Sequence, residues 1–302
     1  MSASRVSLAI LLAAIIAMPG CGSGKSGAPV PNAAATARGA SWTLGGVPCC
    51  TLIAVPPASA APAASMSTSA AAPVGTGTCP GVRPGATVLT DVGQCTLNFL
   101  FQGSDGNRYI GTAGHCILGT SPIGGDVGEK SWTPGTGPVA RDSGGKRIGE
   151  FAYAILQDPK DFSLIRLDPQ VQASAGMCHF GGPTAVNDDR PGLTQPVMLE
   201  WFGNGIVAGS VLPARSAVAA GMPNPDHVFA QGAATPGDSG SGVISSDGRA
   251  VGALVTVGVH TGSLGLAGGD AGLIGITRLT PQVTRAQQIL GANLVLQSAP
   301  IQ

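Results

Sequence analysis

Charged and aromatic side chains are scarce in this chain of 302 residues. Charged residues make up 11% and aromatic residues 4%, and 16 Lys and Arg are balanced by 16 Asp and Glu. A balanced chain lacks the excess of cations that binding to nucleic-acid phosphates requires. So few charges also argue against a coiled coil and against a chain kept disordered by its own charge. The composition therefore predicts no nucleic-acid partner.

Glycine and proline, in contrast, are abundant, with 47 and 24 residues. Both residues penalise helix interiors, so short strands joined by tight turns are favoured over long helices. Hydrophobic residues make up 43% of the chain, which is enough to build a core. The composition thus predicts a folded domain that consists mainly of β-strands.

A long apolar run occurs at the N-terminus, where Val6 to Met18 contains no charge. A run of this length is short for a membrane span and is typical of a signal peptide, which we assign to residues 1–21. Gly20-Cys21 resembles the end of a bacterial lipoprotein signal, although the two residues before it fit that signal poorly. Export is therefore predicted. Secretion and attachment to the outer face of the bacterial membrane through a lipidated Cys21 remain alternatives.

The run G-C-G-S-G-K-S that follows has the composition of a phosphate-binding loop. That motif needs a glycine at the position of Pro19 and a strand before it, and neither is present, so no nucleotide cofactor is predicted. Residues 22–78 are rich in Ala, Pro, Gly, Ser and Thr and show no periodicity. Such a segment buries too little surface to offset its ordering entropy and is interpreted as a flexible tether. Cys49 and Cys50 within it have no assigned role.

Strand-like runs alternate with turns from Cys79 to Leu296, which we take as one domain followed by a short tail at 297–302. Asp-Gly pairs between apolar runs, within 104–107 and 246–248, predict two hairpins. Four further runs predict strands: 147–154, 161–167, 195–201 and 271–279. Near the end, Thr280 as the cap and Pro281 in the first turn predict a helix. The expected fold class is all-β, either a sandwich or a barrel, with a C-terminal helix.

Four cysteines fall within this domain: Cys79, Cys95, Cys116 and Cys178. An even number in an exported domain predicts disulfides, and three pairings are open. Metal binding is the competing interpretation. It is disfavoured because no two of these cysteines have the spacing of a metal site and the histidines are scattered, so no metal is predicted.

Three segments carry residues suited to nucleophilic catalysis: Y-I-G-T-A-G-H-C with His115, D-F-S-L-I-R-L with Asp161, and T-P-G-D-S-G-S-G-V with Ser239. A serine hydroxyl needs a neighbouring base, and imidazole, with a pKa of about 6.5, suits that task. A carboxylate then orients the imidazole and stabilises its protonated form. Each segment alone is ambiguous, since Gly-Asp-Ser-Gly is often only a turn. Their combination in the order His, Asp, Ser favours a catalytic triad.

The motifs T-A-G-H-C and G-D-S-G resemble the chymotrypsin-like serine proteases, in particular secreted bacterial members such as streptogrisin and alpha-lytic protease. The resemblance covers Cys79 to Leu296. It implies two packed antiparallel Greek-key β-barrels with the site between them. It also implies His115 as general base, Asp161 as the residue that orients it and Ser239 as nucleophile. The backbone N–H groups of Gly237 and Ser239 would form the oxyanion hole.

Disulfide pairing also follows from the resemblance, which suggests Cys95 with Cys116 and, by weaker analogy, Cys79 with Cys178. Two departures from the family pattern are visible. Ser241 stands where the family usually has a second glycine after the Ser-Gly pair. An Ile-Val-Gly-Gly activation sequence is absent, so Asp238 cannot pair with a new N-terminus as in digestive zymogens, and its partner is left open.

Specificity follows by the same analogy, because the residue six before the nucleophile lies at the base of the pocket for the side chain that precedes the scissile bond. That residue is Ala233, and Thr256 and Gly258 belong to the opposing wall. A buried cation would stay unpaired there, which is costly. Cleavage after small or medium apolar residues is therefore expected, with broad preference.

The sequence leaves two candidate functions. The first is an exported serine endopeptidase that acts on protein or peptide substrates without a cofactor. The second is a surface-tethered, non-catalytic binding module built on the protease fold. The sequence predicts no particular oligomeric state.

Overall fold

The computed structural model describes residues 43–44, 47–48, 79–119, 127–190, 196–205, 212–257 and 272–302. The chain divides into two units, Met1–Met66 and Ser67–Gln302. In the first unit the described residues form two antiparallel strands, β1 (Thr43–Leu44) and β2 (Val47–Pro48). The predicted signal peptide with Cys21, nearly all of the predicted tether and the Cys49-Cys50 pair lie outside the described residues.

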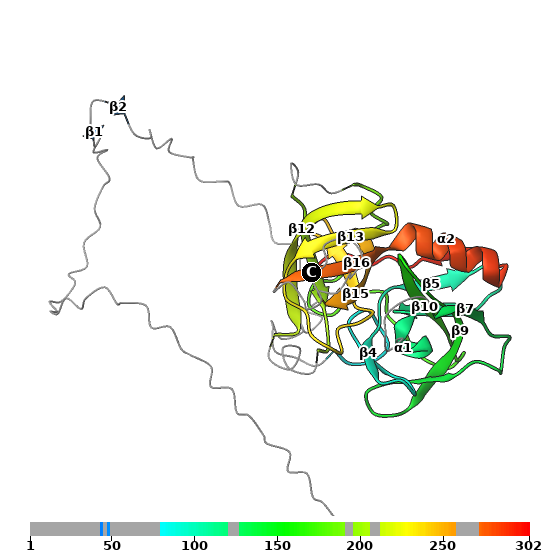
Figure 1. Ribbon diagram of the computed structural model, residues 1–302. Coiled ribbons are helices and arrows are strands. Elements are labelled where there is room, and N and C mark those ends of the chain that lie inside the picture. The colour runs from blue at the N-terminus through cyan, green and yellow to red at the C-terminus, as the bar shows by residue number, and fades with distance from the viewer. Residues whose placement is uncertain are drawn as a thin grey trace, which may run out of the picture. The chain divides into compact units, whose positions relative to one another are not determined.

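Two β-structures make up the described part of the second unit (Figure 1). The first is a half-barrel of nine strands, in the order β17-β5-β6-β10-β9-β8-β3-β4, with β7 paired to β9. Its strands are β3 (Thr87–Leu89), β4 (Gln94–Thr96), β5 (Leu100–Gly103), β6 (Arg108–Thr112), β7 (Gly128–Ser131), β8 (Val139–Arg141), β9 (Arg147–Gln157), β10 (Lys160–Leu167) and β17 (Leu294–Leu296).

The second is a closed barrel of six strands in the order β11-β12-β13-β16-β15-β14, with β14 pairing back to β11. Its strands are β11 (Met198–Phe202), β12 (Ala214–Asn224), β13 (His227–Gln231), β14 (Gly242–Ser245), β15 (Ala250–Val257) and β16 (Leu273–Arg278). The predicted all-β, two-barrel fold is confirmed, with the first barrel open. Both Asp-Gly hairpins are also present, as β5-β6 and β14-β15.

Each barrel has its own apolar core. Phe99, Phe151 and Phe162 are fully buried in the half-barrel, and Trp201 is fully buried in the closed barrel. Strands β9 and β10 are buried along almost their whole length. These two strands are paired, so they form a rigid support for anything attached to their ends.

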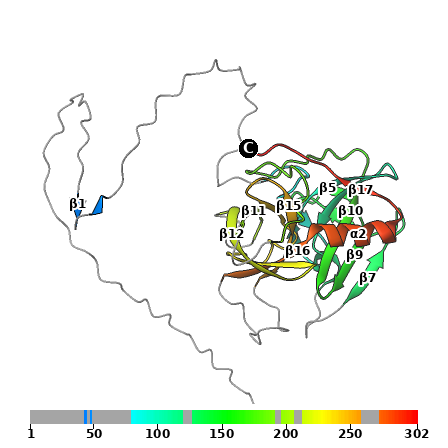
Figure 2. The same ribbon diagram turned by 90° about the horizontal axis from the view of Figure 1, so that it is seen from above.

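The C-terminal helix α2 (Leu279–Leu290) packs against β9 and β10 of the half-barrel and β15 and β16 of the closed barrel (Figure 2). The helix is as predicted, but its predicted cap is wrong. Arg278 is the N-cap residue, and the Thr280 hydroxyl instead lies 2.5 Å from a carboxylate oxygen of Asp188. The helix buries one face through Leu279, Gln282 and Ala286.

The final residues, predicted as a separate tail, are bonded to the domain. The N–H of Gln302 donates to the carbonyl of Phe180 at 2.9 Å, and Pro300 accepts from the N–H of Gly182 at 2.8 Å. Within the described residues, no helix is long and apolar enough to cross a membrane.

Candidate active site

The half-barrel places His115 and Asp161 next to each other through strand register. Strands β6 and β10 are antiparallel, with Thr112 opposite Ser163. Continuing that register beyond the end of β6 sets Asp161 opposite Gly114, the residue before His115. His115 begins the short helix α1 (His115–Leu118), which turns the chain away from the sheet.

Gly114 is needed for this close approach. A Cβ atom at this position would lie 1.9 Å from the carbonyl oxygen of Ile155 and 3.1 Å from Asp161 Oδ1. The chain can therefore run against the end of β9 only if residue 114 has no side chain. The glycine of the T-A-G-H-C motif thus has a steric role in bringing His115 to Asp161.

Asp161 bonds to His115 at two points. Its Oδ1 accepts the backbone N–H of His115 at 3.0 Å, and its Oδ2 lies 2.7 Å from Nδ1 of the imidazole ring. Both side chains are largely buried. An ionised carboxylate can only accept, so Nδ1 carries the proton in this contact and Nε2 is left as the basic nitrogen of the neutral ring.

The same contact changes the acidity of the ring. Burial acts to lower the pKa of His115, but the negative charge of Asp161 and its hydrogen bond to Nδ1 act to raise it. The net effect is a pKa above the usual 6.5. The imidazole is therefore a stronger base than an isolated histidine, as proton abstraction from a hydroxyl requires.

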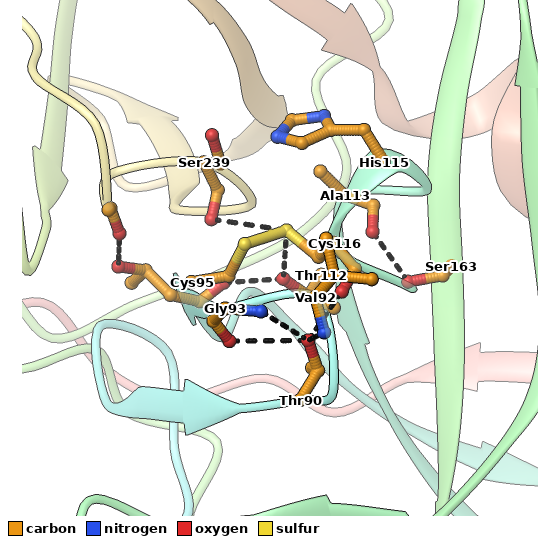
Figure 3. Close-up of a disulfide and its surroundings, with 12 residues drawn as sticks. Thr90, Val92, Gly93, Cys95, Thr112, Ala113, His115, Cys116, Ser163 and Ser239 are labelled. Atoms are coloured by element: carbon orange, nitrogen blue, oxygen red, sulfur yellow. Dashed lines mark hydrogen bonds between the residues drawn. A yellow bond between two sulfur atoms is a disulfide. The ribbon is translucent and has the colours of Figure 1, made fainter. Parts of the chain in front are cut away.

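Ser239 lies in the loop between β13 and β14 of the closed barrel, and Figure 3 shows it beside the His115 ring, above the Cys95–Cys116 disulfide. Its carbonyl oxygen lies 3.9 Å from the sulfur of Cys116, the residue after His115. The hydrogen bonds of the described residues join His115 to Asp161 but do not include one between the Ser239 hydroxyl and the ring. Such a bond is often long before substrate is bound.

Both disulfides suggested by the resemblance are present. Cys95 and Cys116 are joined with an S–S distance of 2.03 Å, which ties β4 to α1 directly beneath His115. Cys79 and Cys178 are joined across 99 residues, so the first residue of the domain is tied to the segment that follows the half-barrel. Pairing of the four cysteines in two bonds resolves the three arrangements that composition left open.

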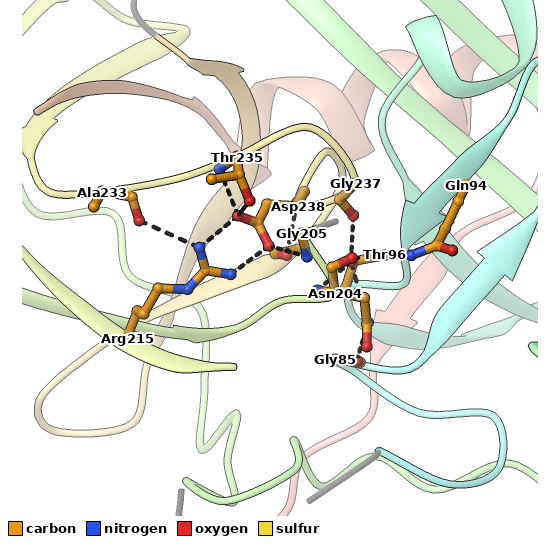
Figure 4. Close-up of polar contacts among 11 residues, drawn as sticks. Gly85, Gln94, Thr96, Asn204, Gly205, Arg215, Ala233, Thr235, Gly237 and Asp238 are labelled. Carbon is orange, nitrogen blue, oxygen red and sulfur yellow. Dashed lines mark hydrogen bonds and ion pairs between the residues drawn. The ribbon is translucent and has the colours of Figure 1, made fainter. Parts of the chain in front are cut away.

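Asp238, whose partner the sequence left open, is paired with Arg215 of β12 (Figure 4). The carboxylate is completely buried, and both of its oxygens contact the guanidinium, one at 2.6 Å. The backbone N–H groups of Gly205 and Thr235 donate to the same carboxylate at 2.7 and 2.8 Å. A buried carboxylate with a bidentate arginine and two further donors is fully satisfied and fixes the loop that carries Ser239.

The predicted oxyanion donors lie in this loop. Gly237 has a φ of 100°, which glycine adopts readily and other residues rarely do. Within the described part of the chain, no hydrogen bond uses the backbone N–H of Gly237 or of Ser239. Both N–H groups are therefore suited to donate hydrogen bonds to an oxygen of a bound molecule.

The predicted substrate pocket is described only in part. Ala233 is exposed, and its carbonyl oxygen lies 3.4 Å from a guanidinium nitrogen of Arg215. Thr256 lies on β15, and Gly258 is outside the described residues. Arg215 is thus a neighbour of the predicted pocket that the sequence did not reveal.

Among the described residues, one group of three side chains of the metal-ligand type lies close together: Cys95, His115 and Cys116. The two cysteines form a disulfide, so neither offers the thiolate that a metal site needs. The chemistry of this cluster is therefore that of an imidazole with a carboxylate partner.

Thr96 and Asn204 were also missed by sequence reasoning. The Thr96 hydroxyl bonds to the carbonyl of Gly237 at 2.8 Å and receives the N–H of Asn204 at 3.1 Å. Thr96 follows Cys95, but nothing in its local sequence indicates a partner 141 residues away. Only the packing of the two barrels brings them together.

Comparison with known proteins found solved structures to which this chain is similar. No family model and no curated protein matches the chain. A glutamic acid-specific serine protease is 18% identical, over 71% of this chain and 100% of that one, with a TM-score of 0.45. Thermobifida fusca Protease A is 13% identical, over 72% and 99%, with a TM-score of 0.47. Nocardiopsis protease is 15% identical, over 71% and 98%, with a TM-score of 0.46. These three structures are of proteases, and each is less than 20% identical to this chain.

Proposed function

We propose that this chain is an exported serine endopeptidase that cleaves peptide bonds through an acyl-enzyme. The observation that carries the proposal is the His115–Asp161 pair, with Nδ1 held by the carboxylate at 2.7 Å and Ser239 beside the ring. That arrangement leaves Nε2 as a base for a hydroxyl proton. Asp161 would hold the ring in the required tautomer and stabilise it once protonated.

The proposed reaction has two stages. Ser239 Oγ attacks the carbonyl carbon of the substrate while its proton passes to His115 Nε2, and the N–H groups of Gly237 and Ser239 stabilise the oxyanion. His115 then protonates the leaving amine, and water activated by the same nitrogen hydrolyses the ester. Each oxyanion donor is worth about 3–4 kcal/mol of transition-state stabilisation.

Labelling with a fluorophosphonate tests this function. Wild-type protein should become labelled at Ser239, as identified by peptide mapping, and Ser239→Ala should not. His115→Ala keeps the hydroxyl but removes the base, so labelling should slow greatly in that variant. A folded wild-type protein that stays unlabelled and cleaves no peptide would support the alternative, a tethered binding module with an unused site.

For specificity, we propose a preference for small or medium apolar side chains before the scissile bond. Ala233 offers no charge to a substrate cation, and the nearby carboxylate of Asp238 is already bound by Arg215. An extra methylene changes the transition-state free energy by only about 1–3 kcal/mol, so the profile should be broad. A peptide-library profile dominated by Arg or Lys at that position would contradict the preference and leave the triad proposal intact.

Export is proposed on the signal-like residues 1–21, with 22–78 as a tether and 79–296 as the protease domain. The two disulfides are compatible with an oxidising compartment. Whether Cys21 carries a lipid can be tested by the mass of the mature protein and its partition into detergent. A mature chain that starts beyond Cys21 and stays in the aqueous phase would support secretion.

A further inference from the structure

Three consecutive peptide groups join Gly237 to Gly240. The first, Gly237–Asp238, is hydrogen-bonded at both its carbonyl oxygen and its N–H. Its carbonyl oxygen accepts the Thr96 hydroxyl at 2.8 Å. Its N–H, that of Asp238, donates to the carbonyl of Thr235 at 3.0 Å. This peptide plane therefore has no freedom to rotate without breaking a buried hydrogen bond.

The third peptide group, Ser239–Gly240, is held in the same way. Its carbonyl oxygen accepts the backbone N–H of Thr96 at 2.8 Å, and its N–H donates to the carbonyl of Leu254 at 2.6 Å. Thr96 thus bonds to both outer peptide groups, to Gly237 through its side chain (Figure 4) and to Ser239 through its backbone.

The middle peptide group, Asp238–Ser239, is held at one end only. Its carbonyl oxygen accepts both the backbone N–H of Ser241 at 3.0 Å and the Ser241 hydroxyl at 2.7 Å. Its other end is the N–H of Ser239, the predicted oxyanion donor. A trans peptide is planar, so fixing the carbonyl direction fixes the N–H in the opposite direction. Two donors on the carbonyl also polarise the peptide and strengthen its N–H as a donor.

The hydroxyl groups of Thr96 and Ser241 are completely buried. The direction of the hydrogen bond from the Thr96 hydroxyl follows from its other partners. The backbone N–H and the side-chain nitrogen of Asn204 lie 3.1 and 3.2 Å from the Thr96 hydroxyl oxygen and can only donate to it. The hydroxyl proton is therefore directed to the carbonyl of Gly237. Thr96 ends β4 of the half-barrel, whereas Ser241 precedes β14 of the closed barrel.

We propose that Thr96 and Ser241 are positioning residues for catalysis: their buried hydroxyls fix the peptide groups around Asp238 and so aim the Ser239 N–H at the substrate oxyanion. This inference rests on the proposed protease function. Ser241 stands where the resembling family usually has glycine, so part of this support is particular to this chain.

The test compares Ser241→Ala and Thr96→Val with wild type on a peptide substrate. Ser241→Ala should lower kcat about 10-fold, and Thr96→Val by about 10- to 100-fold, with KM changed less than about 2-fold, because the support acts only when the oxyanion forms. Thr96→Ser keeps the hydroxyl and should restore kcat to within about 3-fold of wild type. The inhibition constant of a peptidyl trifluoromethyl ketone, whose adduct carries the oxyanion, should rise in parallel with the loss of kcat/KM.

Ser245→Ala is the matched control. Ser245 lies at the far end of β14 and is also buried, and its hydroxyl donates to the carboxylate of Asp247 at 2.6 Å and accepts from the side-chain amide of Asn187 at 2.8 Å. Its loss should lower the unfolding midpoint about as much as Ser241→Ala does and leave kcat and the inhibition constant unchanged.

The outcomes separate the two proposals. If wild type hydrolyses peptides and Ser239→Ala does not, but Ser241→Ala keeps kcat within about 2-fold, the positioning role is wrong and the protease function stands. The positioning role is also wrong if Ser241→Ala and Ser245→Ala lower kcat equally, since stability alone would then explain the loss. Absence of hydrolysis by wild type overturns both proposals.

Discussion

The proposed acid–base pair and the loop that carries the proposed nucleophile are held in place by different means. Asp161 lies on β10 and His115 begins α1 just after the neighbouring strand β6, so strand register and the small Gly114 bring the two side chains into direct contact. Ser239 lies in a loop without regular structure. Within this loop, Asp238 pairs with Arg215 of the closed barrel, and Gly237 bonds to Thr96 of the half-barrel. The first arrangement is local, whereas the second depends on buried polar groups brought from distant parts of the chain. Substitutions in the His115–Asp161 pair should therefore change the reaction rate alone. Substitutions that weaken the support of the Ser239 loop should lower both the reaction rate and the stability.

Removal of the proposed reacting groups, the Ser239 hydroxyl and the His115 imidazole, should have the largest effect. Ser239→Ala and His115→Ala should each lower kcat by about 10⁶-fold, and the double variant should be no worse than either, because the residues act as one unit. Unfolding by urea should remain close to wild type, since neither side chain supports the sheet. Additive losses in the double variant would show that the two residues do not share a step.

Asp161→Asn breaks the local pair without removing a reacting atom. The amide can donate to Nδ1 and favours the wrong tautomer, so kcat should fall by about 10⁴-fold. In wild type, activity needs the neutral ring, and the pKa of His115 lies above 6.5, so activity should rise with pH through a midpoint above that value. In the variant, the charge and the hydrogen bond that raise the pKa of His115 are lost, whereas burial, which lowers it, remains. The midpoint of the pH–rate profile for the residual activity should therefore shift to lower pH than in wild type. A pH–rate profile that keeps the same midpoint in the variant would contradict this assignment.

Arg215→Met breaks the support of the nucleophile loop and should affect stability as well as rate. It leaves the buried Asp238 carboxylate with uncharged partners, the backbone N–H groups of Gly205 and Thr235 and the Thr235 hydroxyl, which should cost about 3–5 kcal/mol of unfolding free energy. Arg147→Met is the matched control, because Arg147 also contacts a carboxylate, that of Asp168, through two nitrogens but is exposed. Its cost should be about 0–1 kcal/mol. Equal costs in urea unfolding would show that burial of the Asp238 pair contributes nothing.

The same contrast explains what the sequence could reveal. The strands at 147–154 and 161–167 and both Asp-Gly hairpins were predictable, because their signals are local periodicity and turn chemistry. The residues of the proposed triad also came from local motifs, T-A-G-H-C around His115 and G-D-S-G around Ser239. Strand β12 was missed because Ala214–Asn224 is rich in Ala and contains Gly and Pro, and only pairing with β11 and β13 makes it a strand.

Long-range polar partners were not predictable. Nothing next to Arg215 in the sequence indicates Asp238, and nothing next to Thr96 indicates Gly237, because each pair meets only after the barrels have closed and packed. The cap at Thr280 was wrong for a related reason. Its hydroxyl bonds to Asp188, which lies 92 residues away, so a tertiary contact overrode a local capping preference.

The smallest effect is expected where the two barrels meet at the surface. Lys160, the residue before Asp161 on β10, forms an ion pair with Asp226 of the turn between β12 and β13. The Lys160 side chain is 29% exposed, so solvent weakens the attraction. Lys160→Met should therefore cost about 0.5–1 kcal/mol of unfolding free energy, and the difference from wild type should shrink in high salt. The rate kcat should change less than about 2-fold, because the strand register and two hydrogen bonds already hold Asp161 against His115. A 10-fold loss of kcat would instead show that the acid–base pair depends on the closed barrel, and the two halves of the site would then no longer differ in how they are supported.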